Sequence, residues 1–182
     1  MGCFKGMKTN IALIGFMGVG KTAVGKALAE KLGRKFVELD SLIEQKVGKS
    51  IPDIFQQDGE VAFRELEIEV TKEVSKDRNL VIACGGGIVL NKINIDRLRQ
   101  QSGIVYLTAS PKVILKRVSG EAGERPLLKA ASRALNIRGL LGFRKPFYER
   151  AADIVIDTSK LDIDSVAEQI ISKLKDDESF DL

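Results

Sequence analysis

The segment IALIGFMGVGKTAVGKALAEKL, residues 11–32, decides the fold. An apolar run of strand length leads into GFMGVGKT, residues 15–22, which fits the pattern G-x-x-x-x-G-K-[ST], and helical spacing follows over residues 21–32. Glycines in such a loop let successive backbone N–H groups surround phosphate oxygens, and the helix that follows adds positive potential. A structural turn with an incidental lysine does not account for four fixed positions in this context. We therefore predict a site for a nucleoside triphosphate.

Within this loop, Lys21 is expected to reach the β- and γ-phosphates, and the Thr22 hydroxyl is expected to coordinate Mg²⁺. Loops of this kind occur in GTPases, motor ATPases and small-molecule kinases. The sequence lacks the GTPase motif NKxD and a conventional Asp-rich Walker B strand. A short chain with little beyond its core sheet favours a kinase that acts on a small metabolite. The predicted nucleotide-binding residues of the loop are Gly18, Val19, Gly20, Lys21, Thr22 and Ala23.

The composition of the 182-residue chain suits one globular domain, with 44% hydrophobic and 30% charged residues. Basic residues are interspersed with acidic ones at a net charge of +4, which favours a small anionic ligand over nucleic acid. The absence of histidine excludes His-based triads and His-containing zinc sites. Two cysteines, Cys3 and Cys84, make no disulfide framework, so we expect a cytoplasmic protein. The longest apolar run is too short to span a membrane.

Apolar runs alternate with segments of helical spacing, which predicts an α/β fold with a parallel sheet and right-handed crossovers. We expect a single domain over residues 9–176, a loose extension at residues 1–8 and a frayed acidic tail at residues 177–182. The expected strands lie near residues 11–14, 35–39, 80–84, 104–107 and 154–156, and the expected helices over residues 21–32, 60–75, 92–99, 111–118, 129–151 (broken) and 166–174.

Two carboxylates, Glu38 and Asp40, follow the second predicted strand. Ligands bind at the carboxyl edge of open α/β sheets, and alternation along an extended segment puts both side chains on one face. Such a pair can hold Mg²⁺ through water and orient or deprotonate an attacking hydroxyl. An Asp cap for a helix over residues 42–47, with Glu38 on a solvated face, explains the local pattern equally well.

The stretch ACGGGIV, residues 83–89, ends the third predicted strand with three glycines, Gly85, Gly86 and Gly87. Each glycine in ordered structure costs about 0.5–1 kcal/mol relative to alanine, so the triplet needs a reason. It lacks a following Lys-Ser/Thr and the G-x-G-x-x-G spacing, which excludes a second nucleotide loop, and a tight turn needs only one glycine. We predict that side chains are absent so that a small hydroxylated anion can lie against the backbone.

Three arginines stand in segments that suggest a second half of the site. The predicted helix over residues 60–75 has a buried stripe of Phe63, Leu66 or Glu67, Val70 and Val74. Arg64 in FRELE lies off this stripe, so its default role is an exposed charge. Arg125 in GERPLLK lies in a loop that suits a phosphoryl-transfer lid, although a solvated loop fits equally well. Arg144 in FRKPFYERAAD lies two residues before Pro146, where the helical pattern must break or restart.

Taken in chain order, these motifs resemble those of the shikimate kinase family: GFMGVGKT, ELDSLIE, IFQQDGEVAFRELE, CGGGIV, RPLL and RKPFYERAAD. The match spans residues 10–157, and the ordered combination is more specific than the phosphate loop alone. The resemblance implies a three-layer P-loop kinase fold with a five-stranded parallel sheet, like that of the nucleoside-monophosphate kinases, and a mobile lid at about residues 119–128. It also implies a cytoplasmic monomer that uses ATP and Mg²⁺ to phosphorylate the 3-hydroxyl of shikimate, on the route to chorismate and the aromatic amino acids.

The resemblance assigns roles to individual positions. Asp40 would contact the shikimate hydroxyls and assist the attacking one, and Arg64 with Arg144 would hold the carboxylate, which suits bidentate arginines. Arg117 would lie along the adenine, and Glu38 would contact Mg²⁺ through water. The implied catalytic residues are Lys21, Asp40 and Arg125, the last also nucleotide-binding, and the implied substrate-binding residues are Asp40, Arg64, Gly85, Gly86, Gly87 and Arg144.

This sequence departs from the family pattern in three places. The family usually has Asp where this chain has Glu38, which predicts altered metal geometry rather than lost activity. The segment between Arg117 and Arg125 is about one residue longer than usual. Gly139 and Gly142 fall in a normally helical segment, which predicts a shorter or bent helix. The competing interpretations are a kinase for another small hydroxy acid such as gluconate and a non-catalytic binding protein, and nucleic-acid binding ranks last.

Overall fold

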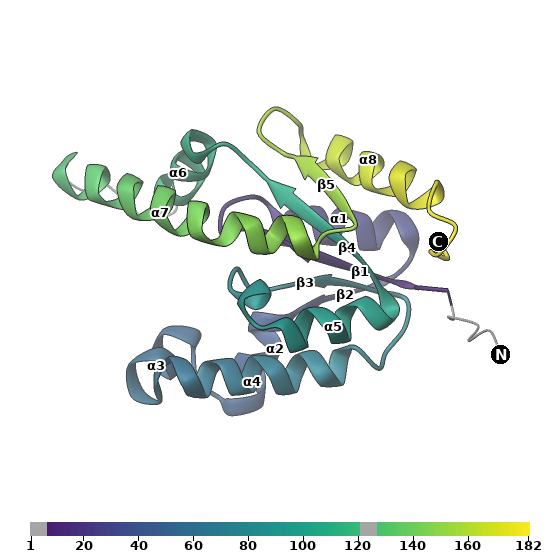
Figure 1. Ribbon diagram of the computed structural model, residues 1–182, viewed down its shortest axis with the longest axis horizontal. Coiled ribbons are helices and arrows are strands. Elements are labelled where there is room, and N and C mark those ends of the chain that lie inside the picture. The colour runs from purple at the N-terminus through teal and green to yellow at the C-terminus, as the bar shows by residue number, and fades with distance from the viewer. Residues whose placement is uncertain (1–6, 121–126) are drawn as a thin grey trace.

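The chain is built around a sheet of parallel β-strands (Figure 1). The computed structural model describes residues 7–120 and 127–182, and within them the sheet has five strands in the order β2-β3-β1-β4-β5. All five residues of β1 are buried, because a central parallel strand is covered on both faces and therefore reads as a continuous apolar run. The strands are β1 (Asn10–Ile14), β2 (Lys35–Glu38), β3 (Leu80–Ala83), β4 (Ser102–Thr108) and β5 (Ile154–Asp157).

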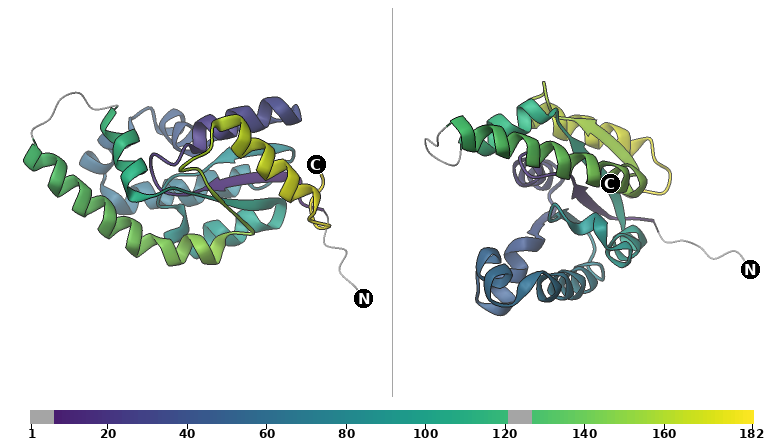
Figure 2. Two further views of the ribbon diagram at one scale, coloured as in Figure 1. Left: turned by 90° about the horizontal axis from the view of Figure 1, so that it is seen from above. Right: turned by 60° about the vertical axis from the view of Figure 1, so that its left-hand side comes forward.

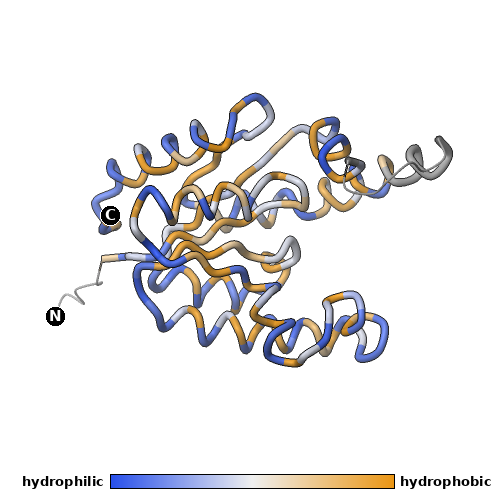
Figure 3. The backbone as a smooth tube through the Cα atoms, turned by 180° about the vertical axis from the view of Figure 1, so that it is seen from behind, coloured by the Kyte–Doolittle hydropathy of each residue, from blue (hydrophilic) through white to orange (hydrophobic). Residues whose placement is uncertain are grey.

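Helices cover both faces of this sheet (Figure 2). On one face α1 packs on β1, β2 and β3 and contacts α8, which packs on β5, whereas α5 and α7 pack on β4 from the other face. Figure 3 shows the apolar residues gathered on the strands and on the inward sides of the helices. The helices are α1 (Lys21–Leu32), α2 (Leu39–Val47), α3 (Ile51–Gln57), α4 (Gly59–Val74), α5 (Lys92–Gln101), α6 (Pro111–Gly120), α7 (Leu127–Ala151) and α8 (Ile163–Lys175), with a 3₁₀ turn η1 (Ile88–Leu90).

The strand order brings the predicted functional loops to one edge of the sheet. β1 pairs with β3 on one side and with β4 on the other, so the strand order reverses at β1. Because the strands are parallel, their carboxyl ends meet at the same edge, and ligands of open α/β sheets bind at such a reversal. The phosphate loop (residues 15–20) follows β1, and Cys84 alone separates β3 from the glycine triplet (Gly85, Gly86 and Gly87).

The predicted five-stranded parallel sheet is confirmed, and α1 has the predicted bounds. The prediction of a break within residues 129–151 is wrong, and so is the shorter helix expected from Gly139 and Gly142, since α7 is continuous with Pro146 inside it. The buried face of α7, including Ile137 and Tyr148, supplies the tertiary contacts that outweigh these unfavourable residues. The short helix α3 was not predicted.

The prediction of a frayed C-terminal tail is also wrong. Phe180 is only 5% exposed, and a parallel bridge joins it to Lys8. A Cβ atom added to Gly103 would lie 3.2 Å from the Phe180 ring, and the Arg34 guanidinium stands 5.5 Å from its centroid. An apolar side chain that packs beside the start of β4 therefore anchors the tail. The domain limits at residues 9 and 176 stay a prediction, and residues 1–6 of the predicted extension lie outside the described residues.

Among residues 7–120 and 127–182, none of the helices combines the length and the apolar character that crossing a bilayer requires.

Candidate active site

A cavity of about 570 Å³, here called the site cavity, opens at the carboxyl edge of the sheet. Its wall comes from the phosphate loop, the start of α1, the end of β2, α2, α4, the glycine triplet and α7. The structure thus brings together residues that lie more than a hundred positions apart in the sequence. The predicted residues that line it are Gly18, Gly20, Lys21, Thr22, Ala23, Glu38, Asp40, Arg64, Gly85, Gly86, Gly87 and Arg144.

The phosphate loop has a backbone that only glycine adopts readily. Gly15, Gly18 and Gly20 have φ angles of +147°, +76° and +99°, and a Cβ atom on Gly15 would lie 2.3 Å from the carbonyl oxygen of Leu107. Since Gly20 precedes α1 and has no side chain to cap it, the first N–H groups of that helix are left for a ligand. This geometry suits an anion at the start of α1.

The Lys21 ammonium group folds back over the phosphate loop. Its Nζ donates hydrogen bonds to the carbonyl oxygens of Gly15 at 2.8 Å and Phe16 at 3.0 Å. Burial lowers the pKa of Lys21 to about 8, although the nearby carboxylates of Asp40 and Glu38 oppose the shift. A phosphate group beside Lys21 would favour its charged form again.

Thr22 and Glu38 supply oxygen atoms of the kind that Mg²⁺ prefers. The Thr22 hydroxyl donates to Glu38 Oε1 at 2.5 Å, and the Ser41 hydroxyl reaches Glu38 Oε2 at 3.3 Å. Within the described residues, no group of three or more Asp, Glu, Cys or His side chains is arranged to hold a metal. Mg²⁺ in phosphoryl-transfer sites takes one or two protein oxygens together with phosphate and water, so this pair fits that ion.

Two carboxylates, Asp40 and Glu67, converge on Gly85. A Cβ atom on Gly85 would lie 2.8 Å from Asp40 Oδ1 and 3.3 Å from Glu67 Oε1. Burial raises the pKa of both carboxyl groups, with Lys21 opposing the shift at Asp40 and Arg64 opposing it at Glu67. Asp40 lies in the first turn of α2 rather than on an extended strand, so the alternation argument for its direction is wrong. The position is nevertheless in the site cavity.

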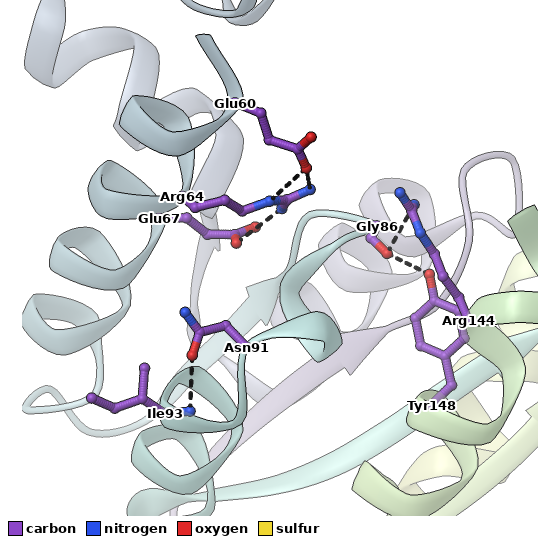
Figure 4. A network of polar contacts seen from close by, with 8 residues as sticks. All are labelled: Glu60, Arg64, Glu67, Gly86, Asn91, Ile93, Arg144 and Tyr148. Carbon is purple, nitrogen blue, oxygen red and sulfur yellow. Dashed lines mark hydrogen bonds and ion pairs between the residues drawn. The ribbon is translucent and has the colours of Figure 1, made fainter.

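Arg64 of α4 is held by two carboxylates and is not the exposed charge that its position off the helix stripe suggested. It bonds Glu60 Oε1 and Glu67 Oε2, each at 3.1 Å, and its side chain is 21% exposed (Figure 4). A Cβ atom on Gly87 would lie 2.5 Å from Arg64 Nη1. The guanidinium therefore occupies the space that a side chain at residue 87 would need.

Arg144 of α7 stands on the opposite side of the loop that carries Gly86 (Figure 4). Its Nη1 lies 3.4 Å from the Gly86 carbonyl oxygen, and its guanidinium lies 5.9 Å from the centroid of the Phe16 ring. The Tyr148 hydroxyl donates to the same carbonyl at 2.5 Å. Within the described part of the chain, the buried Nε of Arg144 has no hydrogen-bond partner. This donor is therefore left for a ligand.

Arg117 lies outside the site cavity but beside the phosphate loop. Its guanidinium donates to the Gly18 carbonyl at 3.2 Å and to the Thr158 hydroxyl and carbonyl at 3.1 and 2.9 Å. It lines a mostly apolar cavity of about 450 Å³ together with Val19, Ala23 and Leu161. Arg125, the last of the predicted residues, lies outside the described residues.

The sequence analysis missed two residues that shape the site. Glu67 is 1% exposed, and the helical period had left residues 66 and 67 as alternatives for the buried face. Tyr148 follows Arg144 by four residues, the spacing that puts two side chains on one face of a helix. That spacing was the available signal, but it does not say what the tyrosine contacts.

The phosphate loop after β1, the β2-β3-β1-β4-β5 sheet and the polar cavity beside the loop define a P-loop kinase. A family model described as shikimate kinase matches residues 17–175. A shikimate kinase of Caldanaerobacter subterraneus subsp. tengcongensis is 46% identical over 162 residues, which cover 89% of this chain and 94% of that protein. The chain belongs to the shikimate kinase family.

Solved structures support the same grouping. A shikimate kinase from Acinetobacter baumannii in complex with shikimate has a TM-score of 0.85 and 37% identity, with 94% of this chain and 95% of that chain covered. A gluconokinase from Sinorhizobium meliloti has a TM-score of 0.60 and 16% identity, with 94% of each chain covered. The second likeness shows the shared fold alone.

Proposed function

We propose that this chain transfers the γ-phosphoryl group of ATP to the 3-hydroxyl of shikimate, which yields shikimate 3-phosphate and ADP for chorismate and aromatic amino acid biosynthesis. The observation that carries the proposal is one cavity that holds a phosphate loop, a buried carboxylate at Asp40 and two arginines on either side of the glycine triplet. Shikimate kinases use ATP as the phosphoryl donor. The acceptor chemistry follows from the rest of the cavity.

At the donor end, the amide groups of residues 18–23 hold the ATP phosphates, and Lys21 bonds the β- and γ-phosphates. Binding requires Lys21 to exchange the carbonyls of Gly15 and Phe16 for phosphate oxygens. Arg117 lies along the adenine, in the apolar cavity next to the loop. Arg125 would contact the phosphates, the role that the family resemblance implies for it.

Thr22 and Glu38 would hold Mg²⁺, the threonine directly and the glutamate through water. When bound, the ion would neutralise the negative charge that develops on the phosphate oxygens during transfer. The hydrogen bond between Thr22 and Glu38 supports this role, because it keeps two oxygen donors side by side at the start of α1. Glu38 is long enough to reach Thr22 from the last residue of β2.

At the acceptor end, Asp40 accepts the hydrogen bond of the attacking hydroxyl and withdraws its proton. Burial raises the pKa of Asp40, which makes it a better proton acceptor than an exposed aspartate. The partner-free Glu67 Oε1 is directed at the same place beside Gly85, where it accepts a second substrate hydroxyl. Two carboxylate acceptors suit a polyhydroxylated ring.

Arg64 and Arg144 bind the substrate carboxylate from opposite sides of the glycine triplet. Gly85, Gly86 and Gly87 present backbone between them, so that a ring can lie flat against the loop. Gluconate also carries a carboxylate and hydroxyls, but a flexible open chain does not need a flat wall of bare backbone. We further propose that the chain acts as a cytoplasmic monomer and binds neither nucleic acid nor membrane, and light scattering after gel filtration tests the monomer.

A coupled assay of ADP release tests the activity with Mg-ATP and each of shikimate, quinate and gluconate. We expect turnover with shikimate and at least tenfold lower kcat/KM with the other two acids. A Lys21→Ala variant purified in parallel must show no shikimate-dependent ADP release, which controls for contaminating host kinases. Phosphorus NMR of the product establishes which hydroxyl is phosphorylated.

Turnover with gluconate but not with shikimate would contradict the proposal and show that the protein is a kinase for another small hydroxy acid. Shikimate binding in calorimetry without any ADP release would instead support a non-catalytic binding protein.

A further inference from the structure

We propose that Tyr148 is a positioning residue for the substrate pocket: its hydroxyl fixes the Gly86–Gly87 peptide and keeps Arg144 free to bind the substrate carboxylate. The inference rests on the proposed function, because it concerns how the same pocket holds its acceptor. Four observations carry it: the burial and stacking of the ring, the hydrogen bond to Gly86, the unused amides of the triplet and the position of Arg144.

The Tyr148 ring has little freedom to move. It is fully buried and stacks on Tyr106 of β4, with ring centroids 4.9 Å apart and planes 15° from parallel. Tyr106 is itself 2% exposed in a strand that pairs on both sides. Burial raises the pKa of Tyr148 to about 12, so the hydroxyl stays protonated and remains a donor at any physiological pH. The central sheet therefore fixes the direction of this donor.

The hydroxyl holds the middle carbonyl of the triplet. Within the loop, the Ile88 amide bonds the Gly85 carbonyl at 3.2 Å, and the Leu90 amide bonds the Gly87 carbonyl at 3.0 Å. The Gly86 carbonyl instead receives the Tyr148 hydroxyl at 2.5 Å. Glycine gives a loop more backbone freedom than any other residue, so a triplet needs such external restraints to keep one conformation.

Fixing this carbonyl also fixes the amide on the other side of the same peptide. In a planar trans peptide the C=O of Gly86 and the N–H of Gly87 point in opposite directions. Because the carbonyl faces Tyr148 on α7, the Gly87 N–H points away from α7. In the described part of the chain, neither the Gly86 amide nor the Gly87 amide donates a hydrogen bond. Both border the site cavity and are left for ligand oxygens.

Arg144 is the competing donor for the Gly86 carbonyl. It lies one helical turn before Tyr148 and reaches the same oxygen only weakly, at 3.4 Å. A carbonyl that loses its partner is unfavourable, so removal of the phenol would draw the Arg144 guanidinium onto it. The arginine would then be engaged within the protein rather than with a carboxylate. The tyrosine thus spares Arg144 for the substrate.

The test compares Tyr148→Phe with Tyr106→Phe, which removes a hydroxyl from the other ring of the same stack. For Tyr148→Phe we expect the KM for shikimate to rise about tenfold, the effect of one buried hydrogen bond, while the KM for ATP stays within twofold. For Tyr106→Phe we expect both constants within twofold of wild type. An equal change in both KM values for Tyr148→Phe would indicate a merely structural role and overturn the proposal.

A double-mutant cycle with Arg144→Gln separates positioning from packing. Because the tyrosine acts through the arginine, Tyr148→Phe is expected to change the KM for shikimate less than twofold once the guanidinium is absent. If the double variant raised the KM for shikimate by the product of the two single effects, the two residues would act independently and this account would be wrong. Wild-type protein without shikimate turnover would contradict the proposed function. An unchanged KM for shikimate in Tyr148→Phe would instead remove only the role of Tyr148.

A second measurement needs no variant and covers the case in which Tyr148→Phe does not fold. In wild-type protein labelled with ¹⁵N-glycine, shikimate is expected to move the Gly87 amide proton downfield, as a new hydrogen bond to an anion requires. Gly139 and Gly142, on the exposed face of α7, provide reference signals that should not move. An unmoved Gly87 signal at saturating shikimate would overturn the proposal.

Discussion

The phosphate loop after β1 and the glycine triplet after β3 are two glycine-rich loops that border the same cavity. In the phosphate loop, Gly15, Gly18 and Gly20 all have φ angles in the range that side chains rarely adopt. In the triplet none of the three glycines has such an angle, and Gly87 has a φ of −99°. An alanine would fit the triplet's backbone, but at Gly85 and Gly87 it would not fit the surroundings.

The difference lies in what each glycine makes room for. The phosphate loop needs glycine so that its backbone can turn its amides toward an anion. The triplet needs glycine because the neighbouring space is filled: by Asp40 and Glu67 at Gly85, and by the Arg64 guanidinium at Gly87. At Gly86 the nearest atom to an added Cβ, Arg144 Nη1, is 3.7 Å away. Two loops of similar composition thus have separate physical requirements, and alanine substitutions distinguish them.

The largest effect is expected for Gly15→Ala, which combines both requirements. The new Cβ would lie 2.3 Å from the Leu107 carbonyl oxygen, a backbone atom that cannot move aside as a flexible side chain could. The φ angle of +147° is also one that alanine rarely adopts. We expect the free energy of unfolding in urea to fall by about 2–4 kcal/mol and ATP binding to be lost. Gly33→Ala, with φ at +61° and open space around it, isolates the backbone cost at about 1–2 kcal/mol. Equal losses in the two variants would contradict the crowding at Gly15.

The next largest effect is expected for Gly87→Ala. Its Cβ would lie 2.5 Å from Arg64 Nη1, so the guanidinium must leave its place between Glu60 and Glu67. We expect the KM for shikimate to rise about 10- to 100-fold, as for loss of a charged hydrogen-bonded contact, with the KM for ATP unchanged. Steady-state kinetics with each substrate varied in turn measure both constants. An unchanged KM for shikimate would remove Arg64 from the carboxylate site.

The fold was largely predictable because its strands are apolar runs and its phosphate loop is a fixed pattern. α3 was missed because only Ile54 of its seven residues is buried, which leaves no periodic stripe to read. The continuity of α7 was missed because Gly139, Gly142 and Pro146 are unfavourable in any isolated helix, whereas packing on the sheet decides the outcome here.

The site was predictable as a set of residues but not as a geometry. The chain shows three consecutive glycines, yet the groups that fill the space around them come from residues 40, 64 and 67, on two other helices. Glu67 was ambiguous because a carboxylate on a helix reads as solvated, and its burial depends on the partner Arg64. Which side chains a glycine accommodates is a tertiary property that a local pattern does not contain.

A smaller effect on KM, with no effect on folding, is expected for Gly86→Ala. Because an added Cβ meets nothing closer than 3.7 Å, the free energy of unfolding should change by less than about 0.5 kcal/mol. The same Cβ would project toward Arg144, into space that the proposed ring occupies, so we expect the KM for shikimate to rise about three- to tenfold. A normal KM would show that the bare backbone serves the protein's own side chains and not the substrate.

The phosphate loop is also expected to take up protons when it binds its ligand. Burial holds the pKa of Lys21 at about 8, below its ordinary 10.5, so between these values the unfolded chain binds more protons and the ligand-free protein gains stability as pH rises. Phosphate oxygens stabilise the charged form, so near pH 8 ATP binding should take up about half a proton. Calorimetry in two buffers of different ionisation enthalpy measures the uptake. An uptake below a tenth of a proton would mean that Lys21 is already charged in the free protein.

The smallest effect, and one of opposite sign, is expected for Gly139→Ala and Gly142→Ala. Both glycines lie in the interior of α7, are exposed, have ordinary helical backbone and would meet nothing within 4 Å of an added Cβ. With neither a backbone nor a space requirement, alanine should raise the free energy of unfolding by about 0.5–1 kcal/mol per site. Urea unfolding of the single and double variants measures this gain, and both KM values should stay within twofold of wild type. A loss of stability at either site would mean that α7 requires glycine for a reason other than backbone conformation or lack of space.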